Sequence, residues 1–216
     1  MKIYAVRSAK SIWLLPTYFL NPKGIFLLPA VELLKARYMF ARTSPDVSGD
    51  DKSLKFEHGA FKSTNGNVEI LSMTIHGDGI VVETRSSTDD GDQFLEDVIS
   101  WVSQEFGLPI SSELPFKKIY ASELNVEFLR LPALLNPEFT YFFDSVSSAI
   151  ANEHTGKAQL LQLTLGTDQT RTKSPPTFII AREIDTPIEA KRFYSFSPTK
   201  TDIHISLLEK LEPLSI

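Results

Sequence analysis

Three aspartates stand together where a helix is expected to begin. Asp89, Asp90 and Asp92 directly follow Ser87 and Thr88 and precede an apolar stripe. Carboxylate oxygens are ligands that divalent cations prefer, but a calcium loop spreads its acids over about twelve residues and closes with a glutamate. This stretch lacks that pattern. The spacing favours a helix start instead, with a Ser87 or Thr88 hydroxyl as the cap and negative charge at the positive end of the helix dipole.

The histidines are spaced unlike metal ligands. No two of His58, His76, His154 and His204 are separated by a metal-ligand interval. The chain also has no cysteine, which excludes disulfides, thiolate metal sites, iron–sulfur clusters and cysteine nucleophiles. We therefore expect surface or packing roles for the histidines, and neither a metal nor another cofactor.

No nucleophile or nucleotide motif is present. The sequence lacks the G-x-S-x-G elbow, H-E-x-x-H, the P-loop and the dinucleotide-binding glycine pattern. A Ser–His–Asp set assembled in space stays open, because such triads are defined by geometry. Arg182, Glu183 and Asp185 could form a polar site, but charges on a strand more commonly face solvent. The sequence therefore assigns no catalytic residue.

A loose basic cluster marks the last quarter of the chain and is the candidate interaction patch: Arg171, Lys173, Arg182, Lys191 and Arg192. The whole chain is acidic, with a formal net charge of −5 and an isoelectric point near 5.4. Nucleic-acid binders usually carry a basic field. We therefore expect a protein partner or self-association, with nucleic-acid binding through this patch as an alternative.

The clearest local structure is a strand followed by an amphipathic helix. Residues 79–86 follow a Gly-Asp-Gly turn and are rich in β-branched side chains, which predicts a strand. Residues 88–106 carry apolar side chains at steps of three and four, which predicts a helix that Gly107 ends. The same order recurs at 190–197 and 201–212.

Short matches in the same order suggest an internal duplication. Lys2–Ala5 recurs as Lys118–Ala121, 116 residues later, and Thr88-Asp89 recurs as Thr201-Asp202, 113 residues later. Leu20-Asn21-Pro22 likewise recurs as Leu135-Asn136-Pro137. We therefore predict two tandem halves, 1–112 and 113–216.

Each half is predicted to have the order β-α-β-β-β-α, giving an α+β fold with a mainly antiparallel sheet and helices packed on one face. The first half has strands at 2–8, 53–62, 67–76 and 79–86, helices at 25–42 and 88–106, and a polar loop at 43–52. The second half opens with a long strand around Tyr120–Phe128, followed by helices at 138–153 and 201–212 and strands at 157–167, 176–184 and 190–197. The spacing of apolar residues at 67–76 indicates a bulge or slipped register.

The element order is similar to that of the duplicated TATA-binding-protein-like folds and, more loosely, to the repeats of sliding clamps. No motif of either family is present, and the acidic charge argues against DNA binding through a sheet. Fold analogy alone does not give function.

The amino-acid composition limits the classes of protein that remain. The hydrophobic fraction of 42% and aromatic fraction of 11% suffice for a core with aromatic side chains left over for an interface. No apolar run reaches the roughly 18 residues that a membrane span needs, and we expect a cytoplasmic protein. The hypothesis is a non-catalytic interaction or assembly protein, either a subunit of a larger complex or a homo-oligomer. One alternative is an enzyme with a dispersed Asp/Glu/His site in a cleft between the halves.

Overall fold

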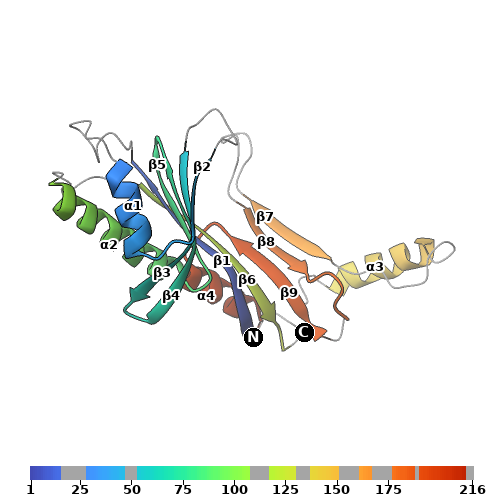
Figure 1. Ribbon diagram of the computed structural model, residues 1–216. Coiled ribbons are helices and arrows are strands. Elements are labelled where there is room, and N and C mark those ends of the chain that lie inside the picture. Colours follow the sequence, from blue (N-terminus) through green and yellow to red (C-terminus); the bar gives the residue numbers. More distant parts are fainter. Residues whose placement is uncertain are drawn as a thin grey trace. The chain divides into compact units, whose positions relative to one another are not determined.

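Nine strands form one antiparallel sheet, accompanied by four helices, in the computed structural model of the chain (Figure 1). The structure describes residues 1–15, 28–46, 53–107, 117–129, 137–150, 161–166, 177–187 and 190–212. Within these ranges the strands follow the order β2-β3-β4-β5-β1-β6-β9-β8-β7. The predicted α+β class and the antiparallel sheet are confirmed.

The strands are β1 (Lys2–Leu14), β2 (Arg42–Asp46), β3 (Ser53–Ser63), β4 (Gly66–His76), β5 (Gly79–Thr84), β6 (Lys117–Glu127), β7 (Gln162–Gly166), β8 (Thr177–Arg182) and β9 (Arg192–Ser197). The helices are α1 (Leu28–Arg37), α2 (Thr88–Phe106), α3 (Pro137–Ile150) and α4 (Thr201–Leu211). None of these described helices is both long and apolar enough to cross a membrane.

Contacts along the backbone divide the chain into two compact units. The N-terminal unit comprises Val6–Glu123 and Pro198–Asp202. The C-terminal unit comprises Leu124–Ser197, Ile203–Ile216 and Met1–Ala5.

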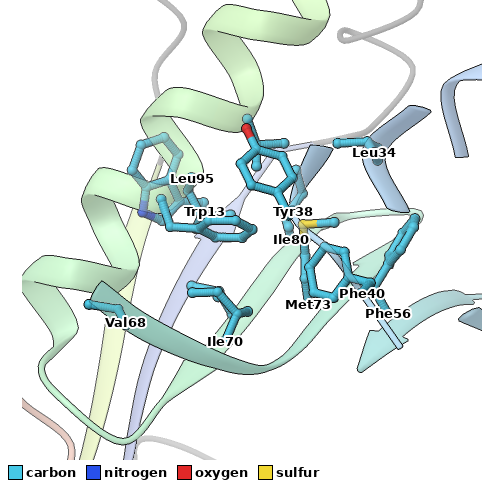
Figure 2. Packing of buried hydrophobic residues seen from close by; sticks show 13 residues of the cluster. Trp13, Leu34, Tyr38, Phe40, Phe56, Val68, Ile70, Met73, Ile80 and Leu95 are labelled. Carbon is cyan, nitrogen blue, oxygen red and sulfur yellow. The ribbon is translucent and has the colours of Figure 1, made fainter. Parts of the chain in front are cut away.

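The core of the N-terminal unit is built from two helices and the strands they cover (Figure 2). Leu34 and Tyr38, from α1 and the residue that follows it, meet Phe94 of α2 in this cluster. The rings of Tyr38 and Phe94 make an edge-to-face contact at 4.9 Å, a favoured aromatic arrangement. The strands contribute Trp13, Phe56, Val68, Ile70, Met73, Ile80 and Val82, and Phe40 comes from the segment between α1 and β2.

Helix α2 begins and ends where the sequence predicts. Ser87 is the N-cap, because its side chain accepts a hydrogen bond from the Asp90 amide. Gly107 ends the helix in the left-handed conformation, with φ of 60°. Phe94, Leu95 and Val98 of the predicted stripe are buried.

The bulge predicted in residues 67–76 is confirmed. The register between β4 and β5 shifts between Ile70 and Ser72. The extra residue lets Val68, Ile70 and Met73 all reach the core despite their uneven spacing.

Two boundaries in the first half differ from the prediction. The first strand continues to Leu14 rather than ending at residue 8, because it pairs with β5 from Ala9 opposite Thr84 to Leu14 opposite Gly79. The helix expected at 25–42 ends at Arg37, before Met39 takes a left-handed φ of 53°. Its expected first residues, 25–27, lie outside the described ranges.

The polar loop expected at 43–52 is partly a strand. β2 pairs with β3 from Arg42 opposite Glu57 to Asp46 opposite Ser53. An edge strand needs only one neighbour and tolerates a residue such as Pro45, which lacks a backbone donor. The remainder of this stretch, 47–52, is not described.

The C-terminal unit has a smaller set of buried side chains. Leu124, Val126 and Phe128 alternate along β6 and its end, as the sequence predicts. They join Ile180 of β8, Phe193 of β9 and Leu208 of α4 among the buried residues of this unit. The described elements α3, β7, β8 and β9 fall within or near their predicted ranges, whereas residues 151–160, which include the predicted start of β7, are not described.

Candidate functional site

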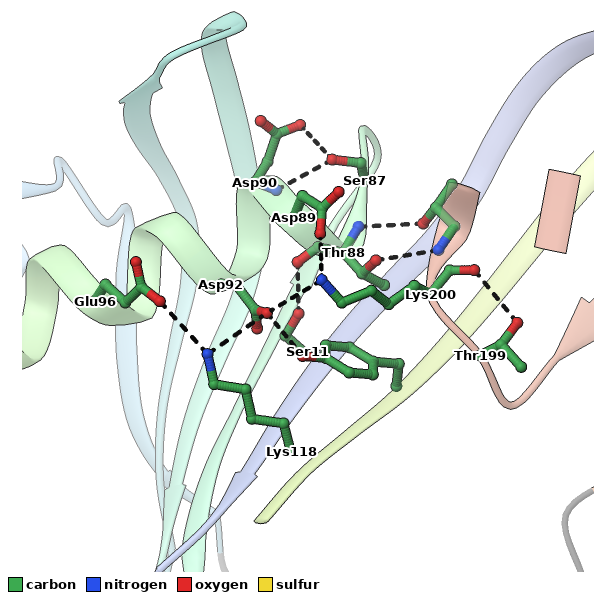
Figure 3. Close-up of polar contacts among 12 residues, drawn as sticks. Ser11, Ser87, Thr88, Asp89, Asp90, Asp92, Glu96, Lys118, Thr199 and Lys200 are labelled. Atoms are coloured by element: carbon green, nitrogen blue, oxygen red, sulfur yellow. Dashed lines mark hydrogen bonds and ion pairs between the residues drawn. The ribbon is translucent and has the colours of Figure 1, made fainter. Parts of the chain in front are cut away.

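The aspartates that open α2 have three different surroundings (Figure 3). Asp90 is 3% exposed and belongs to the helix cap. The Ser87 hydroxyl donates to its carboxylate at 2.8 Å, and the Asn65 side-chain amide donates at 3.2 Å. Burial alone would raise the pKa of Asp90, but these and neighbouring serine hydrogen bonds outweigh it and lower the pKa. Asp90 is therefore a capping carboxylate, as the spacing predicts.

Asp92 is the centre of a second arrangement and is 8% exposed. Its carboxylate accepts hydrogen bonds from Trp13 Nε1 and Tyr120 Oη, both at 2.8 Å. The amines of Lys118 and Lys200 lie 3.8 and 3.9 Å from its Oδ2 atom. Burial and the hydrogen bond to Asp92 raise the pKa of Tyr120, so this phenol stays protonated.

The two lysines have further partners. Lys118 lies 3.4 Å from Glu96 and 3.9 Å from the centre of the Trp13 ring. Lys200 donates to Asp89 at 2.6 Å, and this hydrogen bond raises the lysine pKa. The cluster thus matches cations with carboxylates. Among the described residues, no group of three or more His, Asp or Glu side chains is arranged to hold a metal ion.

The first residues of α2 and α4 bind each other. The Thr88 amide donates to Thr201 Oγ1 at 3.1 Å, and the Thr201 amide donates to Thr88 Oγ1 at 3.1 Å (Figure 3). Both residues are buried. The first amides of a helix have no partner inside it, so each threonine supplies the acceptor that the other helix needs.

The three described histidines have separate roles. His58 lies 3.6 Å from Glu69 on the neighbouring strand, and His76 ends β4. His204 of α4 is buried against Ser195 of β9 at 2.9 Å. His154 lies outside the described residues. This placement agrees with the surface and packing roles expected for the histidines described.

A groove of about 530 Å³ lies in the N-terminal unit beside the end of α1. Its lining holds one carboxylate, that of Asp97, together with Arg37 and Tyr38. Asp97 accepts from Tyr38 Oη at 2.6 Å and from Arg37 at 3.2 Å. Burial and this hydrogen bond raise the pKa of Tyr38. The carboxylate of Asp97 in this groove is therefore already bound to two side chains of the fold, and Lys62, whose side chain carries an amine, also belongs to the lining.

The structure brings part of the candidate basic patch together. Arg182 is opposite Phe193 in the β8–β9 ladder, and Lys191 and Arg192 are the two residues that precede this phenylalanine in the chain. Arg171 and Lys173 lie outside the described residues.

Each described cation of the patch is engaged within the C-terminal unit. Arg182 donates to the Pro187 carbonyl at 3.1 Å, and Lys191 donates to the Leu129 carbonyl at 2.7 Å. Arg192 lies 3.9 Å from Glu127. The positive charges of this group are therefore partly satisfied by the fold.

Glu183 joins a polar group that the sequence does not reveal. Its carboxylate accepts hydrogen bonds from Tyr4 Oη and from the Asn125 side chain, the latter at 3.0 Å. Burial and Glu183 raise the pKa of Tyr4 to about 12. Tyr4 and Glu183 are 179 residues apart, so no local pattern signals the contact. Asp185 lies beyond the strand, in a turn with a φ of 63°.

The C-terminal unit also carries a set of exposed apolar side chains, two of which, Tyr141 and Phe142, belong to an aromatic-rich stretch of the sequence. Ile184 is 85% exposed, Tyr141 80% and Leu129 71%. Phe142, Leu161 and Leu165 are also more than half exposed. The alternation of leucines at 161, 163 and 165 is visible in the sequence, but their exposure depends on the place of β7 in the sheet.

No protein-family model matches this chain, and no curated protein matches its sequence.

Proposed function

We propose that the chain is a non-catalytic interaction or assembly protein, acting as a subunit of a larger complex or as a homo-oligomer. The observation that supports this proposal most directly is the uneven distribution of exposed apolar side chains. Apart from Met39, every large apolar residue described as more than half exposed belongs to the C-terminal unit. Concentrated apolar exposure is typical of surfaces that bind another protein.

The polar clusters support the same proposal. Tyrosine pKa values are raised at three places, and at each place the hydroxyl is bound to a carboxylate: Tyr4 to Glu183, Tyr38 to Asp97 and Tyr120 to Asp92. Structural networks shift pKa values as active sites do. These contacts link distant segments of the fold, and no described contact favours the enzyme or nucleic-acid alternatives.

The proposal includes an internal duplication with halves at 1–112 and 113–216. The strand order supports it, since β1 and β6 lie next to each other, each flanked by the last strand of its own half, β5 and β9. The reciprocal bonds of Thr88 and Thr201, 113 residues apart, support it as well. Helices on one face are supported by the shared core of α1 and α2. The lack of cysteine fits a cytoplasmic location.

The native mass tests this function. We expect light scattering after size-exclusion chromatography to give a mass above 24.2 kDa for the pure protein, or a stable complex when the protein is isolated from its own cell at low salt. A strict monomer without a partner under both conditions would contradict the proposal.

A matched pair of variants locates the surface. We expect Ile184→Lys to weaken the assembly, because it places a charge at the most exposed apolar residue of the C-terminal unit. Met39→Lys is the control, since Met39 is 68% exposed but belongs to the N-terminal unit. Equal loss of assembly in both variants would argue against the C-terminal surface.

A further inference from the structure

Strand β7 stands at the end of the described sheet, and its own five residues include none of the types that usually protect an edge. Its sequence, QLTLG, has no charge and no proline. Leu161, just before it, is 67% exposed and Leu165 is 54% exposed. An open edge offers unpaired backbone groups to another strand, and natural proteins guard such edges with charges, prolines or bulges.

The opposite edge of the same sheet is guarded. β2 contains Arg42, Pro45 and Asp46 within five residues. Pro45 has no backbone donor, and the charged side chains disfavour pairing with another strand. The two edge strands of the described sheet therefore differ in the residues that discourage pairing, which β2 contains and β7 lacks.

The two halves of the described sheet contain different numbers of strands. From β1 outward the order runs β5, β4, β3 and β2, whereas from β6 outward it runs β9, β8 and β7. β7 therefore takes the place that β3 takes in the first half. No described strand takes the place beyond β7 that corresponds to β2.

The hydrogen bonds to β8 show which groups of β7 face outward. The Arg182 amide donates to the Leu161 carbonyl at 2.8 Å, and Leu163 and Leu165 follow in the same register opposite Ile180 and Phe178. Backbone groups alternate in direction along an antiparallel pair. The amides of Gln162, Thr164 and Gly166 are therefore directed away from β8.

We propose that β7 pairs with β7 of a second copy of this chain, in antiparallel orientation about a two-fold axis at Thr164. This inference rests on the proposed assembly function. In this register the outward groups of Thr164 meet those of its copy, and Gln162 meets Gly166. Leu163 then lies opposite Leu165, an apolar cross-strand pair.

A second copy of this chain is the partner that fits the uncharged sequence of β7 best. Because β7 is uncharged, self-pairing brings no like charges together, whereas like charges directly opposite each other destabilise a sheet. The two-fold contact uses the same surface on both copies and so closes at a dimer. A foreign strand would find no charge on β7 to select it.

Thr164→Pro tests the contact. Proline removes the outward amide at the axis and leaves the bonds to β8 in place. We expect the wild-type mass to be twice 24.2 kDa and the variant to fall to a single chain. Thr164→Val is the matched control, since it keeps the backbone donor and should stay dimeric.

Further outcomes of these measurements distinguish a failure of β7 pairing from a failure of the proposed function. A Thr164→Pro protein that stays dimeric overturns β7 pairing and leaves the assembly function standing. If the wild-type protein is a monomer that binds a different protein, β7 pairing is overturned and the assembly function stands. If the wild-type protein is a monomer without any partner, both β7 pairing and the assembly function are overturned. If circular dichroism shows that the proline variant is unfolded, Leu165→Lys replaces it, because two lysines would then lie beside the axis; a dimer of this variant would also overturn the contact.

Discussion

The Ser195 hydroxyl and the His204 imidazole form a buried pair in the C-terminal unit, with Oγ and Nε2 2.9 Å apart and neither residue accessible to solvent. The hydroxyl donates its proton to the Ile179 carbonyl at 2.9 Å. Nε2 must therefore carry the ring proton and donate to Ser195. Nδ1 is buried without a hydrogen-bond partner among the described residues, so nothing there stabilises a second ring proton.

This pair predicts a loss of stability in mild acid. Burial lowers the pKa of His204 from 6.5 to about 4. Between these values the unfolded chain binds a proton that the folded chain does not, so the free energy of unfolding falls as the pH is lowered. We expect a loss of about 2 kcal/mol between pH 7.5 and pH 5. Urea denaturation at a series of pH values measures it.

A neutral replacement provides the control for the pH effect. His204→Gln removes the titrating group, so its stability should change less than that of the wild type over the same pH range. Restricting the comparison to pH above 5 limits the contribution of carboxylates, whose ordinary pKa values are near 4. Parallel pH curves for the two proteins would show that His204 is not the cause.

The contact between Thr88 and Thr201 predicts that two substitutions lower the free energy of unfolding by similar amounts. Thr88→Val leaves the Thr201 amide without its acceptor, and Thr201→Val does the same to the Thr88 amide. An unsatisfied buried donor costs about 1–3 kcal/mol. We expect both variants to lose stability within this range in urea denaturation.

Serine at either threonine position distinguishes the hydrogen bond from packing. Thr88→Ser and Thr201→Ser keep the hydroxyl acceptor and lose only a methyl group, so each should be more stable than the matching valine variant. Valine variants as stable as the wild type would mean that water or another group satisfies the two amides.

Helix α2 could be predicted to the residue because its signals are local. Ser87 and Asp90, three residues apart, form the cap, and Gly107 supplies the left-handed stop. The turn at Gly77 and Asp78 is equally local, with His76 paired to Gly79. Short-range chemistry determines these elements whatever lies around them.

Long-range contacts explain what could not be predicted. β2 is a strand because β3 offers it an edge, and the polar sequence at Arg42–Asp46 carries no sign of that neighbour. Asp92 meets Trp13, 79 residues away, and Tyr120, 28 residues away. The position of Asp92 in the sequence predicted a negative charge in the first turn of α2. Its burial and its partners depend on where β1 and β6 lie against α2, which no local pattern shows.

A close approach in the core predicts that replacing Gly59 with a larger residue destabilises the fold. A Cβ atom at this position would lie 2.5 Å from Cε1 of Phe40, which is itself buried against Phe56 with ring centres 5.2 Å apart. Overpacking of this kind costs about 1–3 kcal/mol. We expect Gly59→Ala to lower the free energy of unfolding by that amount. Gly77→Ala is the control, since its Cβ would meet no atom within 4 Å, and it should leave stability nearly unchanged.

A second substitution tests whether the Phe40 ring is the obstacle at Gly59. Phe40→Leu shortens the side chain and lowers stability by itself, since a large buried group is lost. The added cost of Gly59→Ala should nevertheless be smaller in the Phe40→Leu background than in the wild type, because the ring atoms that the new methyl group meets are gone. A double-mutant cycle from urea denaturation measures this coupling. If alanine costs the same in both backgrounds, the constraint on Gly59 comes from the backbone beside it and not from Phe40.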